Sequence, residues 1–141
     1  MGRVVLDTSV VLAVLDPDDA LHHAAVDAMR RHRDRHAQFT LPASALAELL
    51  VGAARRGDGE LQTRRQQVTA AFGSPVPLDE PVAVTAARLR ARHRFLRLPD
   101  ALVLATADVV DAETVLTGDK KWPRLDPRVE LVSPPAVAPA A

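Results

Sequence analysis

Short apolar strands that alternate with helical segments constrain the fold of this 141-residue chain more than any other feature. Residues 3–6 predict a strand that ends at Asp7, and residues 8–15 predict a helix directly after it. The pattern nearly recurs at residues 114–117, a predicted strand that runs into Gly118 and Asp119. Strands separated by helices indicate an α/β sandwich with a mainly parallel sheet.

The rest of the chain fits the same alternation within one domain, residues 1–132. A Pro- and Ala-rich segment, residues 133–141, is expected to be a flexible tail. Further strands are predicted at residues 38–41, 75–78 and 129–132, and helices at 20–35, 42–55, 60–72, 81–93 and 101–110, the last opened by Leu98-Pro99-Asp100.

Composition narrows the classes of function without selecting one. Eighteen basic and eighteen acidic residues cancel, so the net charge gives no hint of a nucleic-acid partner. The absence of cysteine excludes disulfides, a thiolate nucleophile and zinc-thiolate sites. Because the first residues reach a charge too early for a signal peptide, we expect a cytoplasmic protein without a membrane span.

Four acidic residues occur where this fold would bring side chains together. Asp7 and Asp119 each follow a predicted strand, and Asp100 lies at the start of an apolar helix. Glu48 is the only charge between residues 43 and 54, and an ionised carboxylate is seldom buried without a partner. Since ligands gather at the carboxyl ends of parallel strands, we expect the four acids to converge in one pocket.

Each acid has an ordinary explanation when it is taken alone. Asp7 suits a helix N-cap, Asp100 suits the positive end of a helix macrodipole, and Asp119 suits a turn. Glu48 would also fit a narrow exposed strip of its helix. Together, however, four carboxylates would repel one another unless a cation neutralised them, and an all-oxygen ligand set suits Mg²⁺ or Mn²⁺.

Other chemical signals are weak. The five histidines lie at helical or charged surface positions apart from the acids, so we do not expect them to bind the metal. The chain has no Gly-x-Ser-x-Gly, Walker lysine loop or Gly-x-Gly-x-x-Gly motif. The four acids therefore carry the prediction of function.

The sequence around these acids resembles a known family. Val5-Leu6-Asp7-Thr8-Ser9, Ala47-Glu48-Leu49, Leu98-Pro99-Asp100-Ala101-Leu102-Val103 and Leu116-Thr117-Gly118-Asp119 are similar to the four motifs of PIN-domain nucleases, in particular the VapC-type toxins of type II toxin-antitoxin systems. The similarity runs from residue 3 to about residue 132, and no acidic position departs from the pattern.

The resemblance implies an RNase-H-like three-layer α/β/α sandwich and a Mg²⁺- or Mn²⁺-dependent endoribonuclease. In such enzymes the metal activates water for in-line attack on an RNA phosphodiester and leaves a 5′-phosphate. Asp7 and Asp100 would bind the metal, Glu48 and Asp119 would complete the site directly or through water, and one or two ions would fit. Ser9 and Thr117 are similar to supporting hydroxyls of this site.

The resemblance also implies a homodimer and an antitoxin protein that covers the active site. An acidic pocket alone would repel RNA, so basic side chains must surround it. With no tyrosine, one tryptophan and three phenylalanines, the chain has few side chains that stack on bases, so we expect recognition by RNA shape and phosphate position. Basic candidates, each of which would equally suit a solvated surface position, are Arg55, Arg56, Arg92, Arg94, Arg97, Lys120 and Lys121.

Several alternatives stay open at this point. A haloacid-dehalogenase phosphatase would need a second acid where the chain has Ser9, and a glycosidase would usually need aromatic platforms that are scarce here. Stronger alternatives are an RNA-processing PIN nuclease that is not a toxin, and a non-catalytic PIN module that binds RNA or protein.

Overall fold

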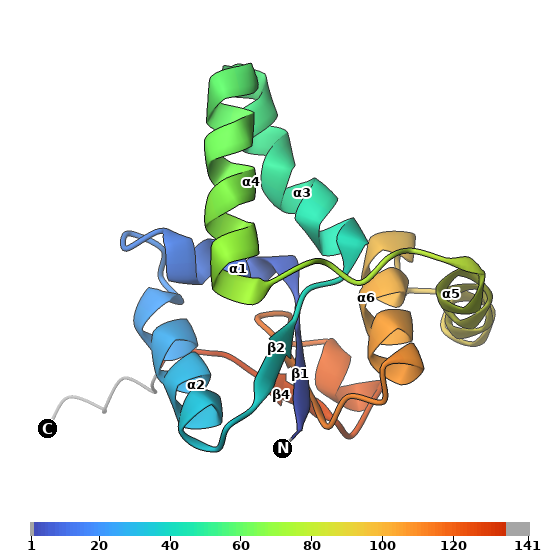
Figure 1. Cartoon of the computed structure of the whole chain (residues 1–141). Coiled ribbons are helices and arrows are strands. Elements are labelled where there is room, and N and C mark those ends of the chain that lie inside the picture. The colour runs from blue at the N-terminus through green and yellow to red at the C-terminus, as the bar shows by residue number, and fades with distance from the viewer. Residues whose placement is uncertain (1, 135–141) are drawn as a thin grey trace, which may run out of the picture.

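A four-stranded parallel sheet forms the centre of the structure, a computed structural model that describes residues 2–134 (Figure 1). Strands β1 (Arg3–Leu6), β2 (Gln38–Thr40), β3 (Thr114–Thr117) and β4 (Val129–Leu131) lie in the order β2-β1-β3-β4, and all neighbours pair in parallel. Val4, Val5 and Leu6 are all buried, as expected for a strand that is covered on both faces. The predicted α/β sandwich with a parallel sheet is confirmed.

Helices cover the sheet on two sides. Helices α1 (Thr8–Leu15) and α2 (His22–Asp34) lie on one side, and α5 (Glu80–Arg92) and α6 (Leu98–Val109) lie on the other (Figure 1). Six residues of α6 are buried, which makes this helix a large part of the core. A 3-10 helix, η1 (Trp122–Arg124), lies in the loop between β3 and β4 and begins at the buried Trp122.

Two long helices, α3 (Ala43–Arg56) and α4 (Asp58–Phe72), form a hairpin that projects from the body (Figure 1). Gly57 joins them with a backbone φ of 124°, a conformation that residues other than glycine adopt only with strain. The buried residues of α4 are Val68 and Phe72, both near its end at the body. The hairpin is therefore anchored at its base.

The predicted elements agree with the structure apart from shifted ends and one strand. The strand predicted at residues 75–78 is wrong: Val76 makes an isolated bridge to Pro42 instead. Val76 exchanges backbone hydrogen bonds with Leu41 and Ala43, each 2.8 Å long, but Pro75 and Pro77 have no N–H with which to extend the ladder. The tail predicted at residues 133–141 falls mostly on residues 135–141, which lie outside the described part of the chain.

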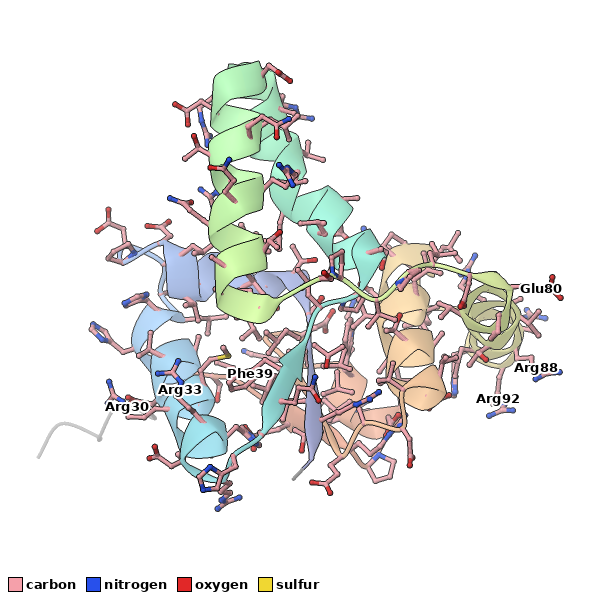
Figure 2. The ribbon with its side chains drawn as sticks, in the orientation of Figure 1. Arg30, Arg33, Phe39, Glu80, Arg88 and Arg92 are labelled. Carbon is pink, nitrogen blue, oxygen red and sulfur yellow. The ribbon has the colours of Figure 1, made fainter. Side chains whose placement is uncertain are left out.

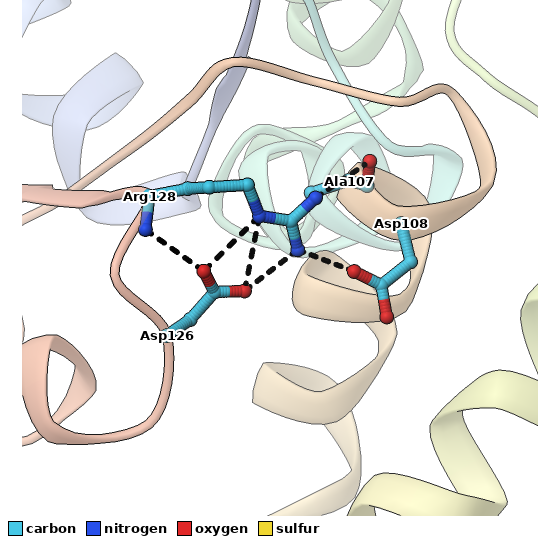
Figure 3. A network of polar contacts seen from close by, with 4 residues as sticks. All are labelled: Ala107, Asp108, Asp126 and Arg128. Atoms are coloured by element: carbon cyan, nitrogen blue, oxygen red, sulfur yellow. Dashed lines mark hydrogen bonds and ion pairs between the residues drawn. The ribbon is translucent and has the colours of Figure 1, made fainter.

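A polar cluster ties the last strand to α6 (Figure 3). Arg128, just before β4, donates from Nε to Asp126 Oδ1 over 3.0 Å and from Nη2 to both Asp126 and Asp108. Its Nη1 also donates to the carbonyl oxygen of Ala107 near the carboxyl end of α6. The guanidinium lowers the pKa of the Asp126 carboxyl, so this pair is fully ionised at neutral pH.

No helix within residues 2–134 combines the length and the apolar character that a membrane crossing requires.

Candidate active site

The candidate site lies at the carboxyl ends of the two central strands. Leu6 of β1 pairs with Leu116 of β3, so the residues that follow these strands begin side by side. From β1 the chain continues to β2 on one side of β1, and it later returns to β3 on the other side. Ligands in parallel α/β proteins usually bind where the strand order reverses in this way.

Asp7 caps a helix and lies at the candidate site. It is the N-cap of α1, and its Oδ1 accepts a 2.8 Å hydrogen bond from the backbone N of Thr8. Its Oδ2 accepts hydrogen bonds from the hydroxyls of Ser9, at 3.0 Å, and Thr117, at 2.8 Å. The N-cap explanation is therefore correct for this residue, and it is compatible with a place in the candidate site.

The loop after β3 is held by the two hydroxyls that donate to this carboxylate. Thr117 Oγ1 accepts from the backbone N of Asp119 over 3.0 Å, and Ser9 Oγ accepts from the backbone N of Gly118 over 3.0 Å. A Cβ on Gly118 would lie 2.8 Å from Leu21 Cδ1 and 3.3 Å from Ser9 Oγ, so a side chain there would disturb this contact. These bonds hold Asp119 beside Asp7.

Asp100 and Glu48 approach this centre from helices. Asp100 lies in the first turn of α6, half-buried, with Oδ2 3.9 Å from Nε of the exposed Arg97. Glu48 lies on α3 and is exposed, so the inference that it is a buried charge is wrong and the exposed-strip interpretation is right. The small side chains around Glu48 leave it reachable by solvent while α3 packs through Ala45, Leu49 and Ala53.

The acids lie close enough to influence one another's ionisation, although burial has the larger effect on their pKa values. Burial raises the pKa of Asp7, and the charge of Asp119 raises it further, against the lowering effect of the Thr117, Ser9 and Thr8 hydrogen bonds. Desolvation and then the charge of Asp7 raise the pKa values of Glu48 and Asp100. The structure thus brings Glu48, Asp100 and Asp119 within electrostatic reach of Asp7.

The donor set suits a divalent cation, although the ligands are not gathered into a shell. Within residues 2–134, no three or more Asp, Glu or His side chains are arranged so that they could hold a metal ion as they stand. The oxygen-only donors and the raised carboxyl pKa values are nevertheless what Mg²⁺ or Mn²⁺ would use and relieve. The residues fit the cation by chemistry and by charge.

A cavity of about 300 Å³ opens beside these acids. Asp100 and Asp119 line it together with Arg97 and Lys121, two of the basic residues singled out in the sequence. Phe95, Leu96, Trp122 and Leu125 complete its lining, and sequence reasoning did not single out any of them. Their only sequence signal is their position near basic residues. Phe95 and Leu96 lie between Arg94 and Arg97, and Trp122 and Leu125 follow Lys121 within four residues.

The other basic candidates lie elsewhere. Arg92 points away from the body on α5 (Figure 2) and lines a different cavity with Arg88 and Asp108. Arg56 lies at the hairpin tip, where its Nε is 4.0 Å from Glu60, and Arg55 precedes it on α3. Arg94 and Lys120 are exposed and do not line the acidic cavity.

One histidine differs from the expectation of surface positions. His32 on α2 is 8% exposed, and its Nε2 lies 3.3 Å from both carboxylate oxygens of Glu130 on β4. A contact between α2 and an edge strand has no local sequence signal. It lies apart from the four acids and serves packing.

The fold and the site define an α/β protein with an acidic centre at the strand-order reversal of a parallel sheet. A family model described as the PIN domain matches residues 4–127. The chain therefore belongs to the PIN domain family.

Solved structures share the fold. A toxin-antitoxin complex from Klebsiella pneumoniae is 21% identical, with a TM-score of 0.72 over 93% of this chain and 98% of that one. FitAcB from Neisseria gonorrhoeae is 25% identical, with a TM-score of 0.65 over 82% and 87%. VapC20 of Mycobacterium tuberculosis, described as a toxin that cleaves the sarcin-ricin loop, is 18% identical, with a TM-score of 0.67 over 86% and 93%. No curated protein matches the chain.

Proposed function

We propose that the chain is a metal-dependent endoribonuclease and the toxin of a toxin-antitoxin pair. The observation that carries this proposal is the Asp7 carboxylate, held by Thr117 and Ser9 and within electrostatic reach of Glu48, Asp100 and Asp119. PIN domain membership and the structural similarity to toxin-antitoxin proteins, one of them described as a toxin that cleaves the sarcin-ricin loop, support it.

In this proposal the acidic residues bind the metal and the hydroxyl residues orient Asp7. Asp7 and Asp100 are the main ligands of Mg²⁺ or Mn²⁺, and Glu48 and Asp119 complete the site directly or through water. The bound cation would neutralise the carboxylates and supply an activated water for attack on a phosphodiester. Thr117 and Ser9 orient Asp7 and oppose the rise of its pKa on burial, because a hydrogen bond to a carboxylate favours its charged form.

Partners follow from the same similarity. We propose that an antitoxin protein covers the acidic centre and that the chain forms a homodimer, as the resemblance to VapC-type toxins implies. An RNA-processing nuclease that is not a toxin would have the same site without the antitoxin. A small reading frame next to this gene that encodes a DNA-binding antitoxin would favour the toxin.

The test is RNA cleavage by the purified protein in Mg²⁺, Mn²⁺ or EDTA, with Asp7→Asn and Asp100→Asn beside it. We expect cleavage in either metal, loss of cleavage in EDTA, and a rate at least about 100-fold lower in each variant. Arg30→Met is a matched control, because Arg30 is exposed on α2 and points away from the body (Figure 2). Equal cleavage under all conditions would contradict the proposal, and no cleavage under any would favour a non-catalytic module.

A further inference from the structure

The cavity beside the acids contains an aromatic side chain that the core does not use. Phe95 lies in the loop between α5 and α6 and is 61% exposed. The chain's other aromatic residues, Phe39, Phe72 and Trp122, all pack in or against the core. Burial of a phenylalanine side chain stabilises a fold, so the exposed Phe95 gains little of that stabilisation in the free protein.

The position of Phe95 is defined by its neighbours. Its ring lies edge-on to His93, with centroids 6.1 Å apart and an interplanar angle of 64°. His93 is the C-cap of α5, and Leu96 on the other side of Phe95 is buried. Arg90 donates a 2.6 Å hydrogen bond to the carbonyl oxygen of Leu96, which ties the loop to α5. The ring is therefore displayed from an anchored loop.

The cavity is lined by the kinds of group that bind the parts of a nucleotide. Phe95 offers an aromatic face, while Arg97 and Lys121 offer cations to phosphate, and Asp100 and Asp119 connect the cavity to the acidic centre. A volume of about 300 Å³ is at the lower end of the range for small-ligand pockets. Apolar face, phosphate-binding cations and reacting centre occur together in this cavity.

We propose that this cavity is a nucleotide subsite of the endoribonuclease, in which Phe95 stacks on a base next to the cleaved bond and Arg97 and Lys121 bind phosphate. This inference rests on the proposed function and makes it more specific. It also changes the expectation that recognition depends on RNA shape and phosphates alone. Because every base has a π-face, stacking on Phe95 would tolerate many sequences while requiring an unpaired base.

The test measures RNA binding without cleavage. A fluorescent, unstructured oligoribonucleotide is titrated with full-length Asp7→Asn protein in Mg²⁺ and followed by anisotropy. Adding Phe95→Ala should weaken binding about 5- to 150-fold, the range of one base-aromatic stack, and Phe95→Trp should restore it. Adding Leu98→Ala is the matched control, because Leu98 is 53% exposed three residues away and does not line the cavity; it should leave binding unchanged.

Inorganic polyphosphate, which has phosphates but no bases, separates stacking from disturbance of the loop. Polyphosphate affinity should fall with Arg97→Ala and be unaffected by Phe95→Ala. If Phe95→Ala weakens polyphosphate and RNA equally, or changes neither, the subsite is overturned, and the unchanged case would leave this face to a protein partner. In those cases wild-type protein would still cleave RNA. Absence of both RNA binding and wild-type cleavage would overturn the proposed function itself, and the subsite with it.

Discussion

At the scale of single residues, the Asp7 carboxylate accepts hydrogen bonds at both of its oxygens. One oxygen caps α1, and the other accepts two hydroxyl hydrogen bonds that come from different parts of the chain. Burial favours the protonated acid, whereas these bonds favour the carboxylate that a cation would need. The hydroxyls therefore control the charge of Asp7 as well as its orientation.

Thr117→Val tests this control. The valine keeps the shape of a side chain that is fully buried but removes the hydrogen bond that lowers the pKa of Asp7. The pKa should rise further, so the acidic limb of the pH profile of kcat/KM for RNA cleavage should move to higher pH. The unfolding free energy should fall by about 1–3 kcal/mol, because a hydrogen bond to a charged group is lost.

The control for this change is Thr106→Val. Thr106 is 2% exposed, and its hydroxyl donates to the carbonyl of Leu102 within α6 over 2.7 Å. The variant should leave the pH profile in place. An unmoved acidic limb in Thr117→Val would contradict the role given to this hydroxyl.

Asp100→Asn should stabilise the metal-free protein at neutral pH. Burial, followed by the charge of Asp7, raises the pKa of Asp100 in the folded state. A carboxyl with a raised folded pKa destabilises the fold as pH rises above the unfolded value of about 3.9. The urea midpoint of the variant in EDTA should thus exceed that of wild type at pH 7, and the two should converge near pH 3. A lower midpoint at pH 7 would show that the Arg97 pair dominates.

At the scale of elements, β1, α1 and β3 could be predicted with their observed bounds, because their apolar runs end at clear polar signals. The strand at residues 75–78 could not, since alternating prolines look apolar but cannot pair. The closeness of Asp7 and Asp119 could be expected because the ends of neighbouring parallel strands share an edge, whereas Glu48 and Asp100 approach from helices. The exposure of Glu48, the cavity and Phe95 depend on how helices and loops pack, which no local pattern reports.

The polar cluster that connects α6 to β4 depends on Arg128, whose side chain is 25% exposed. Arg128→Met should cost about 1–3 kcal/mol of unfolding free energy, because it leaves the Asp108 and Asp126 carboxylates without their shared cation. Arg128 lowers the pKa of Asp126, so its contribution is present at neutral pH and is lost as pH falls through the folded pKa of Asp126. Urea unfolding at pH 7 and near pH 2 measures both effects.

The matched control for Arg128→Met is Arg30→Met. Arg30 is exposed, and its ion pair with Asp27 has a separation of 3.7 Å on the surface of α2. Its loss should change the unfolding free energy by no more than about 0.5 kcal/mol. Similar losses of unfolding free energy in both variants would contradict the stabilising role of the Arg128 cluster.

At the scale of the whole molecule, metal binding should be coupled to folding. If the acids bind Mg²⁺ only in the folded state, Mg²⁺ at about 100 times its Kd should add about 2.7 kcal/mol to the stability of the wild type. Asp7→Asn should lose most of this gain while it still folds. Thermal unfolding in EDTA and in rising Mg²⁺ measures the difference, and NaCl of equal ionic strength controls for screening. An equal gain in both proteins would mean that Mg²⁺ binds elsewhere.

The outer turns of the α3–α4 hairpin should open locally while the sheet stays folded. None of residues 54–67 is buried, so the outer turns can separate without disturbing the sheet. Backbone amides there should exchange with deuterium by local fluctuation, whereas those of β1 and β3 should exchange only on global unfolding. A partner that binds the hairpin would slow exchange in its outer turns first. A deuterium-uptake map of the complex would therefore reveal whether binding involves the hairpin.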